Sequence, residues 1–173
     1  MAVIIIIAFG VVPFVANEYW LQAILIQFLV FSLAAIGLNI LTGYAGQVSL
    51  GTGAFMAVGA YATFKITTAF PEINILIVFI LAGGVSACVG ILFGLPSLRI
   101  KGFYLAVATL AAQFFILWLF NKVGWFYNDS PSGTISAPPR DLFGTLITGP
   151  EATPQARYLV VLGFLTVFTL IAK

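Results

Sequence analysis

Residues 75–95 read ILIVFILAGGVSACVGILFGL, a run of 21 positions without a charged side chain. At about 1.5 Å per residue, a helix of about 20 residues crosses the hydrocarbon core of a bilayer, which is about 30 Å thick. The run therefore predicts a transmembrane helix, and with it a fold built in lipid.

The composition of the whole chain also indicates a membrane protein. Of 173 residues, 62% are hydrophobic and 7% are charged, whereas soluble globular proteins carry about 25% charged residues. The absence of His and the single Cys exclude a Cys/His metal site, a disulfide framework and a His-based catalytic triad. A net charge of +2 gives no indication of nucleic-acid binding.

Five further apolar runs predict helices around the first one. They lie at residues 2–16, 21–41, 48–70, 103–120 and 156–173. The third of these is the weakest candidate, because it is rich in small residues and carries Lys65 near its end. The run at residues 2–16 could instead be the core of a signal peptide, but it lacks a basic start and a cleavage site. We expect an all-α, polytopic transmembrane bundle with about six spans, forming one domain over residues 1–173.

Basic residues in short loops determine the orientation of such a bundle. Arg99 and Lys101 lie together in a short segment without an acid, which we place in the cytoplasm. They could also contact a cytoplasmic protein or anionic lipid, although the positive-inside pattern alone explains them. Counting crossings from there places the amino terminus inside, and the polar, proline-rich residues 121–155 outside as an extracytoplasmic loop.

The most informative motif is GYAGQVSLGTG at residues 43–53, with four glycines in eleven positions. This composition predicts a broken or re-entrant helix near membrane depth, which must face protein or a wet cavity because unsatisfied backbone is costly in lipid. Tyr44, Gln47 and Ser49 would then offer hydrogen bonds to a substrate. The alternative is an ordinary glycine-rich turn at the membrane surface.

Polar side chains inside the predicted spans give two more candidates for a translocation path, Asn39 and Gln113. Hydrogen bonding between helices is the simpler explanation for both. No acidic residue lies in a predicted span, whereas ion-coupled carriers usually keep a carboxylate or an equivalent relay there. The driving force is therefore expected from outside this chain, unless further sequence supplies such a relay.

Small residues recur at every fourth position in the run at residues 75–95. They are Ala82, Ser86, Gly90 and Gly94. Side chains four positions apart share one face of a helix, so these residues predict a flat ridge for close helix packing. A helix that slides during transport is the functional alternative.

Two blocks of this sequence resemble the permease subunits of branched-chain amino-acid ABC importers, the Liv-type inner-membrane permeases. Residues 37–51, GLNILTGYAGQVSLG, resemble the signature of that family, and residues 94–106, GLPSLRIKGFYLA, resemble its next block. The close resemblance covers residues 37–113. Residues 128–144 look like a variant of the family's periplasmic loop, with Pro-Ser-Gly at 131–133 where a richer glycine run is usual.

The resemblance implies a subunit of a bacterial cytoplasmic (inner) membrane importer, of which this chain is a truncated, N-terminal part. It also implies a second homologous permease subunit, two cytoplasmic ATPase subunits and a periplasmic substrate-binding protein that delivers leucine, isoleucine or valine. The chain itself would hold no cofactor and no catalytic site. Permeases for urea or short-chain amides have similar signatures. A non-transporting membrane scaffold and an intramembrane enzyme are the alternative classes, the enzyme being disfavoured by the lack of His and of buried acids.

The orientation predicts which side of the membrane exposes the loop at residues 121–155. A Ser136→Cys variant should react with a membrane-impermeant thiol reagent added to intact cells, because we expect this loop outside. The parent chain, with Cys88 alone, is the control. Labelling that requires permeabilised cells would reverse the orientation.

Overall fold

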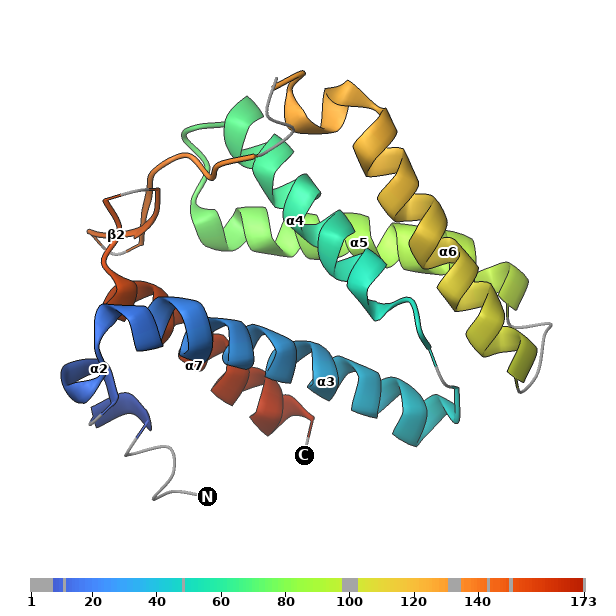
Figure 1. The fold of residues 1–173 in the computed structure, drawn as a ribbon, viewed down its shortest axis with the longest axis horizontal. Helices are drawn as coiled ribbons and strands as arrows, with labels where there is room; N and C mark the ends of the chain where they lie inside the picture. The colour runs from blue at the N-terminus through green and yellow to red at the C-terminus, as the bar shows by residue number, and fades with distance from the viewer. Residues whose placement is uncertain are drawn as a thin grey trace. The chain divides into compact units, whose positions relative to one another are not determined.

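The computed structural model describes residues 8–10, 12–47, 49–97, 103–130, 135–142, 144–149 and 151–172. Most of these residues are helical (Figure 1). The chain divides into two compact units, which consist of Met1–Ile40 with Pro139–Lys173, and of Leu41–Pro138. Each unit has its own buried cluster.

The first unit joins the start of the described chain to its end. Its elements are α2 (Val12–Val15), the π-helix η1 (Trp20–Leu25), most of α3 (Ile26–Ala45), β1 (Arg140–Leu142), β2 (Thr145–Thr148) and α7 (Pro154–Ile171). The π-helix continues directly into α3, so that Trp20–Ala45 forms one helix of 26 residues.

The core of the first unit lies where α7 packs against η1 and the start of α3. Leu21, Leu29, Tyr158 and Leu162 are buried together there. The Tyr158 hydroxyl donates a hydrogen bond to the carbonyl of Ala8 at 3.2 Å, which satisfies the polar tip of a side chain that is only 3% exposed. Residues 150 positions apart in the sequence are thus joined.

A short antiparallel hairpin precedes α7 within the segment predicted as a loop. Strands β1 and β2 pair Asp141 with Leu146 and Leu142 with Thr145. Arg157, in the first turn of α7, donates from Nε to the carbonyl of Ile147 at 3.2 Å and from a terminal nitrogen to the carbonyl of Gly149. These bonds fix the hairpin to the start of the helix. Residues 121–155 therefore contain ordered structure and, in their described part, no helix long enough to span a membrane.

The second unit consists of three helices and a short 3-10 helix. They are α4 (Thr52–Ala69), α5 (Ile75–Ser97), α6 (Phe103–Lys122) and η2 (Gly124–Tyr127). Figure 1 shows α4 and α6 running toward the same end of the unit, with α5 running back between them in the sequence. Ala54, Val58, Ile116 and Phe120 form its buried cluster, with α4 facing α6.

Four helices are long and apolar enough to cross a membrane in the described part of the chain. They are Trp20–Ala45, Ile75–Leu95, Tyr104–Lys122 and Pro154–Ile171. These correspond to four of the six runs predicted from the sequence, and the polytopic helical fold is confirmed.

The other two predicted runs differ from this pattern. The run at 48–70 does form a helix, α4, but Lys65 and four threonines make it less apolar, and it is not among the four. The run at 2–16 lies partly outside the described residues, and the helix found in it, α2, has only four residues. Within the described residues, four of the about six expected spans therefore meet the requirements of length and composition.

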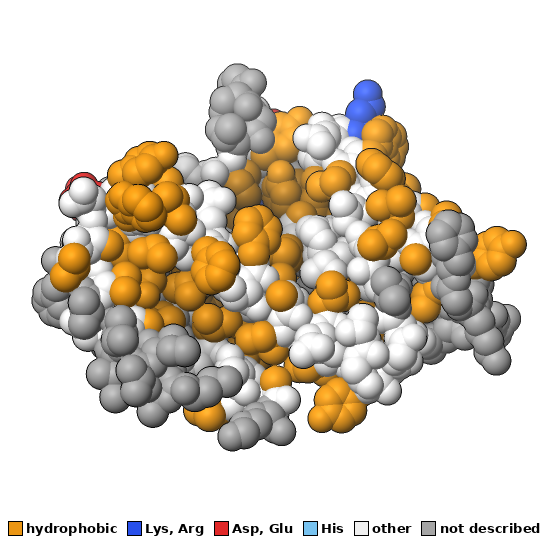
Figure 2. All heavy atoms as spheres, turned by 60° about the horizontal axis from the view of Figure 1, so that its bottom comes forward, with side chains coloured by type: hydrophobic (Ala, Val, Ile, Leu, Met, Phe, Trp, Pro, Cys, Tyr) orange, Lys and Arg blue, Asp and Glu red, His pale blue; other side chains and the backbone are white. Residues whose placement is uncertain are grey.

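The apolar side chains exposed on the surface of the protein indicate that lipid surrounds it. Large apolar side chains of the candidate spans are exposed, among them Phe28 (67%), Ile80 (74%) and Phe114 (65%). Figure 2 shows a face on which hydrophobic side chains gather, with charged ones at its margin. Large contiguous apolar patches are rare on soluble monomers.

The buried cluster of the first unit gives a stability prediction. Leu21→Ala should lower the free energy of unfolding in detergent by about 2 kcal/mol, because it empties a fully buried position between η1 and α7. Ile24→Ala is the matched control, since Ile24 lies on the same π-helix and is 41% exposed. Thermal unfolding of both variants measures the difference. Equal midpoints would show that the cluster does not stabilise the protein.

Candidate functional site

The helix breaks within the glycine-rich motif. Helix α3 ends at Ala45, and Gly46 follows with φ +63°, a backbone conformation that glycine adopts without strain. Its N–H still donates to the carbonyl of Thr42 at 3.1 Å, and regular helix resumes only at Thr52. The motif thus separates α3 from α4, an arrangement that fits both the broken helix and the ordinary turn predicted from the sequence. Re-entry into the bilayer stays a prediction.

Thr109 of α6 anchors the end of this interruption. The N–H of Leu50 donates to Thr109 Oγ1 at 2.9 Å, and the same hydroxyl donates to the carbonyl of Ala106 at 2.9 Å. The N–H of Gly51 donates to Ser49 Oγ at 3.3 Å. Two backbone donors that are outside any helix thus have partners, as burial in a membrane protein requires.

Gly51 permits the close approach of α4 to α6. It is buried, and a Cβ at this position would lie 2.8 Å from the backbone oxygen of Thr109. Any larger residue must separate the start of α4 from α6, because a backbone atom cannot turn aside as a side chain can. Gly53 has more room, since its Cβ would lie 3.5 Å from Gln113 Oε1.

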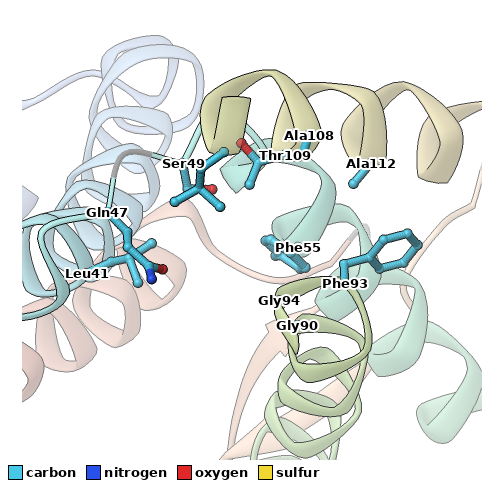
Figure 3. Close-up of a pocket in the computed structure, with 11 residues that line it drawn as sticks. Leu41, Gln47, Ser49, Phe55, Gly90, Phe93, Gly94, Ala108, Thr109 and Ala112 are labelled. Atoms are coloured by element: carbon cyan, nitrogen blue, oxygen red, sulfur yellow. The ribbon is translucent and has the colours of Figure 1, made fainter. Parts of the chain in front are cut away.

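A cavity of about 250 Å³ opens beside this junction (Figure 3). Its walls come from the end of α3, the break, α4, α5 and α6. They are formed by Leu41, Gln47, Ser49, Phe55, Gly90, Phe93, Gly94, Leu105, Ala108, Thr109 and Ala112. Figure 3 shows Ser49 beside Thr109, Gln47 beside Leu41, and the rings of Phe55 and Phe93 in another part of the wall. We call this space the break cavity.

The polar groups of the break cavity differ in what they can still bind. Thr109 already accepts one hydrogen bond and donates another. Ser49 accepts from Gly51, and its own proton can be donated. Within the described part of the chain the Gln47 amide has no hydrogen-bond partner, so that it offers two donors and an acceptor to a solute. Few polar groups in an apolar concave wall are typical of small-molecule sites.

The structure brings together only some of the path candidates named from the sequence. Gln47 and Ser49 line the break cavity, whereas Tyr44, which is 85% exposed, does not. Gln113 lies one turn beyond Thr109, where its amide is next to Gly53 and outside the cavity wall. Asn39 lies on the part of α3 that belongs to the first unit. Roles in transport for all five stay predictions.

The small residues of α5 lie where α4 and the break cavity meet this helix. Ala82 is 3% exposed, and Ser86 Oγ donates to the carbonyl of Phe55 on α4 at 3.0 Å. A Cβ on Gly90 would come within 3.9 Å of the Phe55 ring, and both Gly90 and Gly94 line the cavity. Arg99 and Lys101, named as a cytoplasmic loop, lie outside the described residues.

Sequence reasoning named Gln113 of α6 as a path candidate but not the α6 residues that line this cavity. Leu105, Ala108, Thr109 and Ala112 line it. They follow the i, i+3, i+4, i+7 spacing of one helix face, and three of them are small or carry a hydroxyl. That spacing was the available signal.

Comparison with known proteins identifies the class. The family described as branched-chain amino acid transport system, permease component, matches residues 20–173, and the chain belongs to it. Members of this family are transport components.

Two relatives are named as high-affinity branched-chain amino acid transport system permease protein LivM. The chain is 35% identical over 117 residues to the one from Salmonella typhimurium and 32% identical over 117 residues to the one from Escherichia coli. Each alignment covers 67% of this chain and 27% of the relative, so the chain matches about a quarter of the length of these proteins. No solved structure is significantly similar.

The contact of Gly51 with Thr109 gives a prediction for the junction. Gly51→Ala should lower the thermal stability of the detergent-solubilised protein by about 1–3 kcal/mol, because the new methyl group would overpack against backbone. Gly53→Ala is the control and should not lower the stability, because its methyl group has room and alanine favours a helix over glycine by roughly 1 kcal/mol. A Gly51→Ala protein as stable as the Gly53→Ala protein would contradict the close approach.

Proposed function

We propose that this chain is a membrane-spanning permease subunit of an ATP-driven importer, and that it moves branched-chain amino acids across the bacterial cytoplasmic membrane. The residues that line the break cavity form part of the wall of the translocation path. The single observation that carries this proposal is the combination, at an interrupted helix, of polar groups with an otherwise apolar wall.

The chemistry of the cavity is complementary to an amino acid with an apolar side chain. Gln47 and Ser49 offer donors and acceptors that suit the ammonium and carboxylate groups of such a solute. Phe55, Phe93 and Leu105 offer an apolar surface for a branched side chain. Urea and short amides lack an apolar body of this kind, so the aromatic part of the wall favours the amino acid.

The energy for transport comes, in this proposal, from other subunits. None of the four candidate spans contains Asp or Glu, so the described helices hold no carboxylate relay for proton or sodium coupling. Two cytoplasmic ATPase subunits would drive a second homologous permease subunit and this one between outward-open and inward-open states. A periplasmic binding protein would deliver the solute. The chain would need no cofactor of its own.

Substitution of Gln47 tests the role of the break cavity in transport. Gln47→Leu in the complete transporter should lower the initial rate of leucine uptake about tenfold, equivalent to the loss of one hydrogen bond of about 1.4 kcal/mol. Membrane abundance, measured by immunoblot, should not change. Radiolabelled uptake into cells or proteoliposomes supplies the readout.

Gln22→Leu is the matched control, because it makes the same change at an exposed position of η1 in the other unit. Its uptake should equal that of the wild type. Normal uptake by the Gln47→Leu protein would remove the amide from the path. Uptake of leucine by wild-type protein in vesicles without an ATPase would refute the ATP-driven mechanism.

A further inference from the structure

A second cavity, of about 430 Å³, lies within the second unit among α4, α5, α6 and η2. Apart from Lys65, every side chain that lines it is aliphatic or aromatic, including Val89, Phe93, Leu119 and Phe126. We call it the acyl groove. Phe93 borders both this groove and the break cavity.

In the part of the chain that the structure describes, Lys65 is the one charged residue that lines the acyl groove. The Nζ atom of Lys65 lies 4.2 Å from the centroid of the Trp125 ring, which also lines the groove, and it donates a hydrogen bond to Asn128 Oδ1. Both partners are neutral. Among the described residues, which include all five acids of the chain, no carboxylate forms an ion pair with Lys65. The Asp129 carboxylate lies against Gly124 instead.

The residues around Lys65 place this end of the groove at a membrane surface. Trp125 is 62% exposed, and Tyr127 follows it in η2. Tryptophan and tyrosine are enriched at the level of lipid headgroups, and a lysine near the end of a helix extends its ammonium group to that level. The groove therefore runs from the headgroup region along apolar walls.

The chemistry of the acyl groove excludes two other occupants. A zwitterionic amino acid would bury its ammonium group beside Lys65 and find no acceptor in the aliphatic and aromatic walls. A transmembrane helix packs closely where small residues let the backbones approach. Here Phe93, Phe115 and Leu119 project into the space, so a thin and flexible chain fits better than a helix.

We infer that this groove binds one acyl chain of an anionic phospholipid, whose phosphate group pairs with Lys65. The aliphatic and aromatic walls replace neighbouring lipid tails, and Trp125 and Asn128 hold the ammonium group at the point where the phosphate enters. Lysine has three N–H donors, so the bond to Asn128 leaves donors for the phosphate. The lipid would be a structural ligand of the second unit, distinct from the transported solute.

The complete transporter, purified and reconstituted in nanodiscs of equal parts phosphatidylglycerol and phosphatidylcholine, provides the test. After partial delipidation, mass spectrometry of the retained lipid should show phosphatidylglycerol enriched about fivefold over phosphatidylcholine, the preference expected of one lysine at the membrane surface. Lys65→Gln should abolish the enrichment, and Lys65→Arg should keep it. Lys122→Gln is the matched control, since Lys122 is exposed and does not line the groove.

A second pair of variants tests the groove independently of the charge. Ala62→Leu fills part of the space and should lower the amount of retained phosphatidylglycerol, whereas Ala60→Leu, at an exposed position of the same helix outside the groove, should not. Quenching of Trp125 fluorescence by brominated phosphatidylglycerol, taken as the difference from a Trp125→Phe protein, should fall in parallel.

Three results would overturn the inference. Enrichment that survives Lys65→Gln would separate the lipid from this lysine. Displacement of the lipid by glycerol phosphate at equal concentration would indicate a site for free phosphate compounds. Absence of retained lipid, with Trp125 shielded from brominated lipid by another subunit, would assign the groove to a protein interface.

Discussion

The hydrogen bond from Leu50 to Thr109 is the interaction on which the second unit depends. A backbone donor without a partner costs several kcal/mol in a lipid environment, so a chain that leaves helical geometry there needs a partner for it. Thr109 supplies that partner from another helix, 59 residues away in the sequence. The start of α4 is thereby held against α6, and the absence of a side chain at Gly51 lets the two backbones meet.

The break cavity follows from this junction. Helix α4 begins at Thr52 and packs on α5 through Ser86 and Gly90, and Gln47, Ser49 and Thr109 line the space beside this packing. The small residues of α5 therefore serve packing at one end and leave room at the other.

The two cavities of the second unit have opposite chemistry although Phe93 borders both. One combines Gln47, Ser49 and Thr109 with apolar walls, and the other has Lys65 as its single charged group. The break cavity fits a solute that must enter and leave, because its polar groups are few and uncharged. The second fits the acyl chain of the proposed bound lipid, because its walls are apolar apart from Lys65.

The sequence by itself determined the features that depend on local composition. The uncharged run at residues 75–95 is long enough to cross a bilayer wherever it is placed, and the cluster of glycines at 43–53 favours an interruption between two helices. Spacing by four positions likewise placed Ala82, Ser86 and Gly90 on one face. The blocks at 37–51 and 94–106 indicated the family that the comparison then established.

Only the tertiary structure decided which side chains meet. Gln47 and Ser49 share a cavity with Thr109, whereas Tyr44 and Gln113 do not line it, and the hydrogen bond from Leu50 to Thr109 joins the segment after α3 to α6 there. The hairpin before α7 depends on Arg157, and the cation at the acyl groove depends on Trp125, which is 60 residues from Lys65. Such contacts join elements distant in the sequence, and their geometry is a property of how the helices pack.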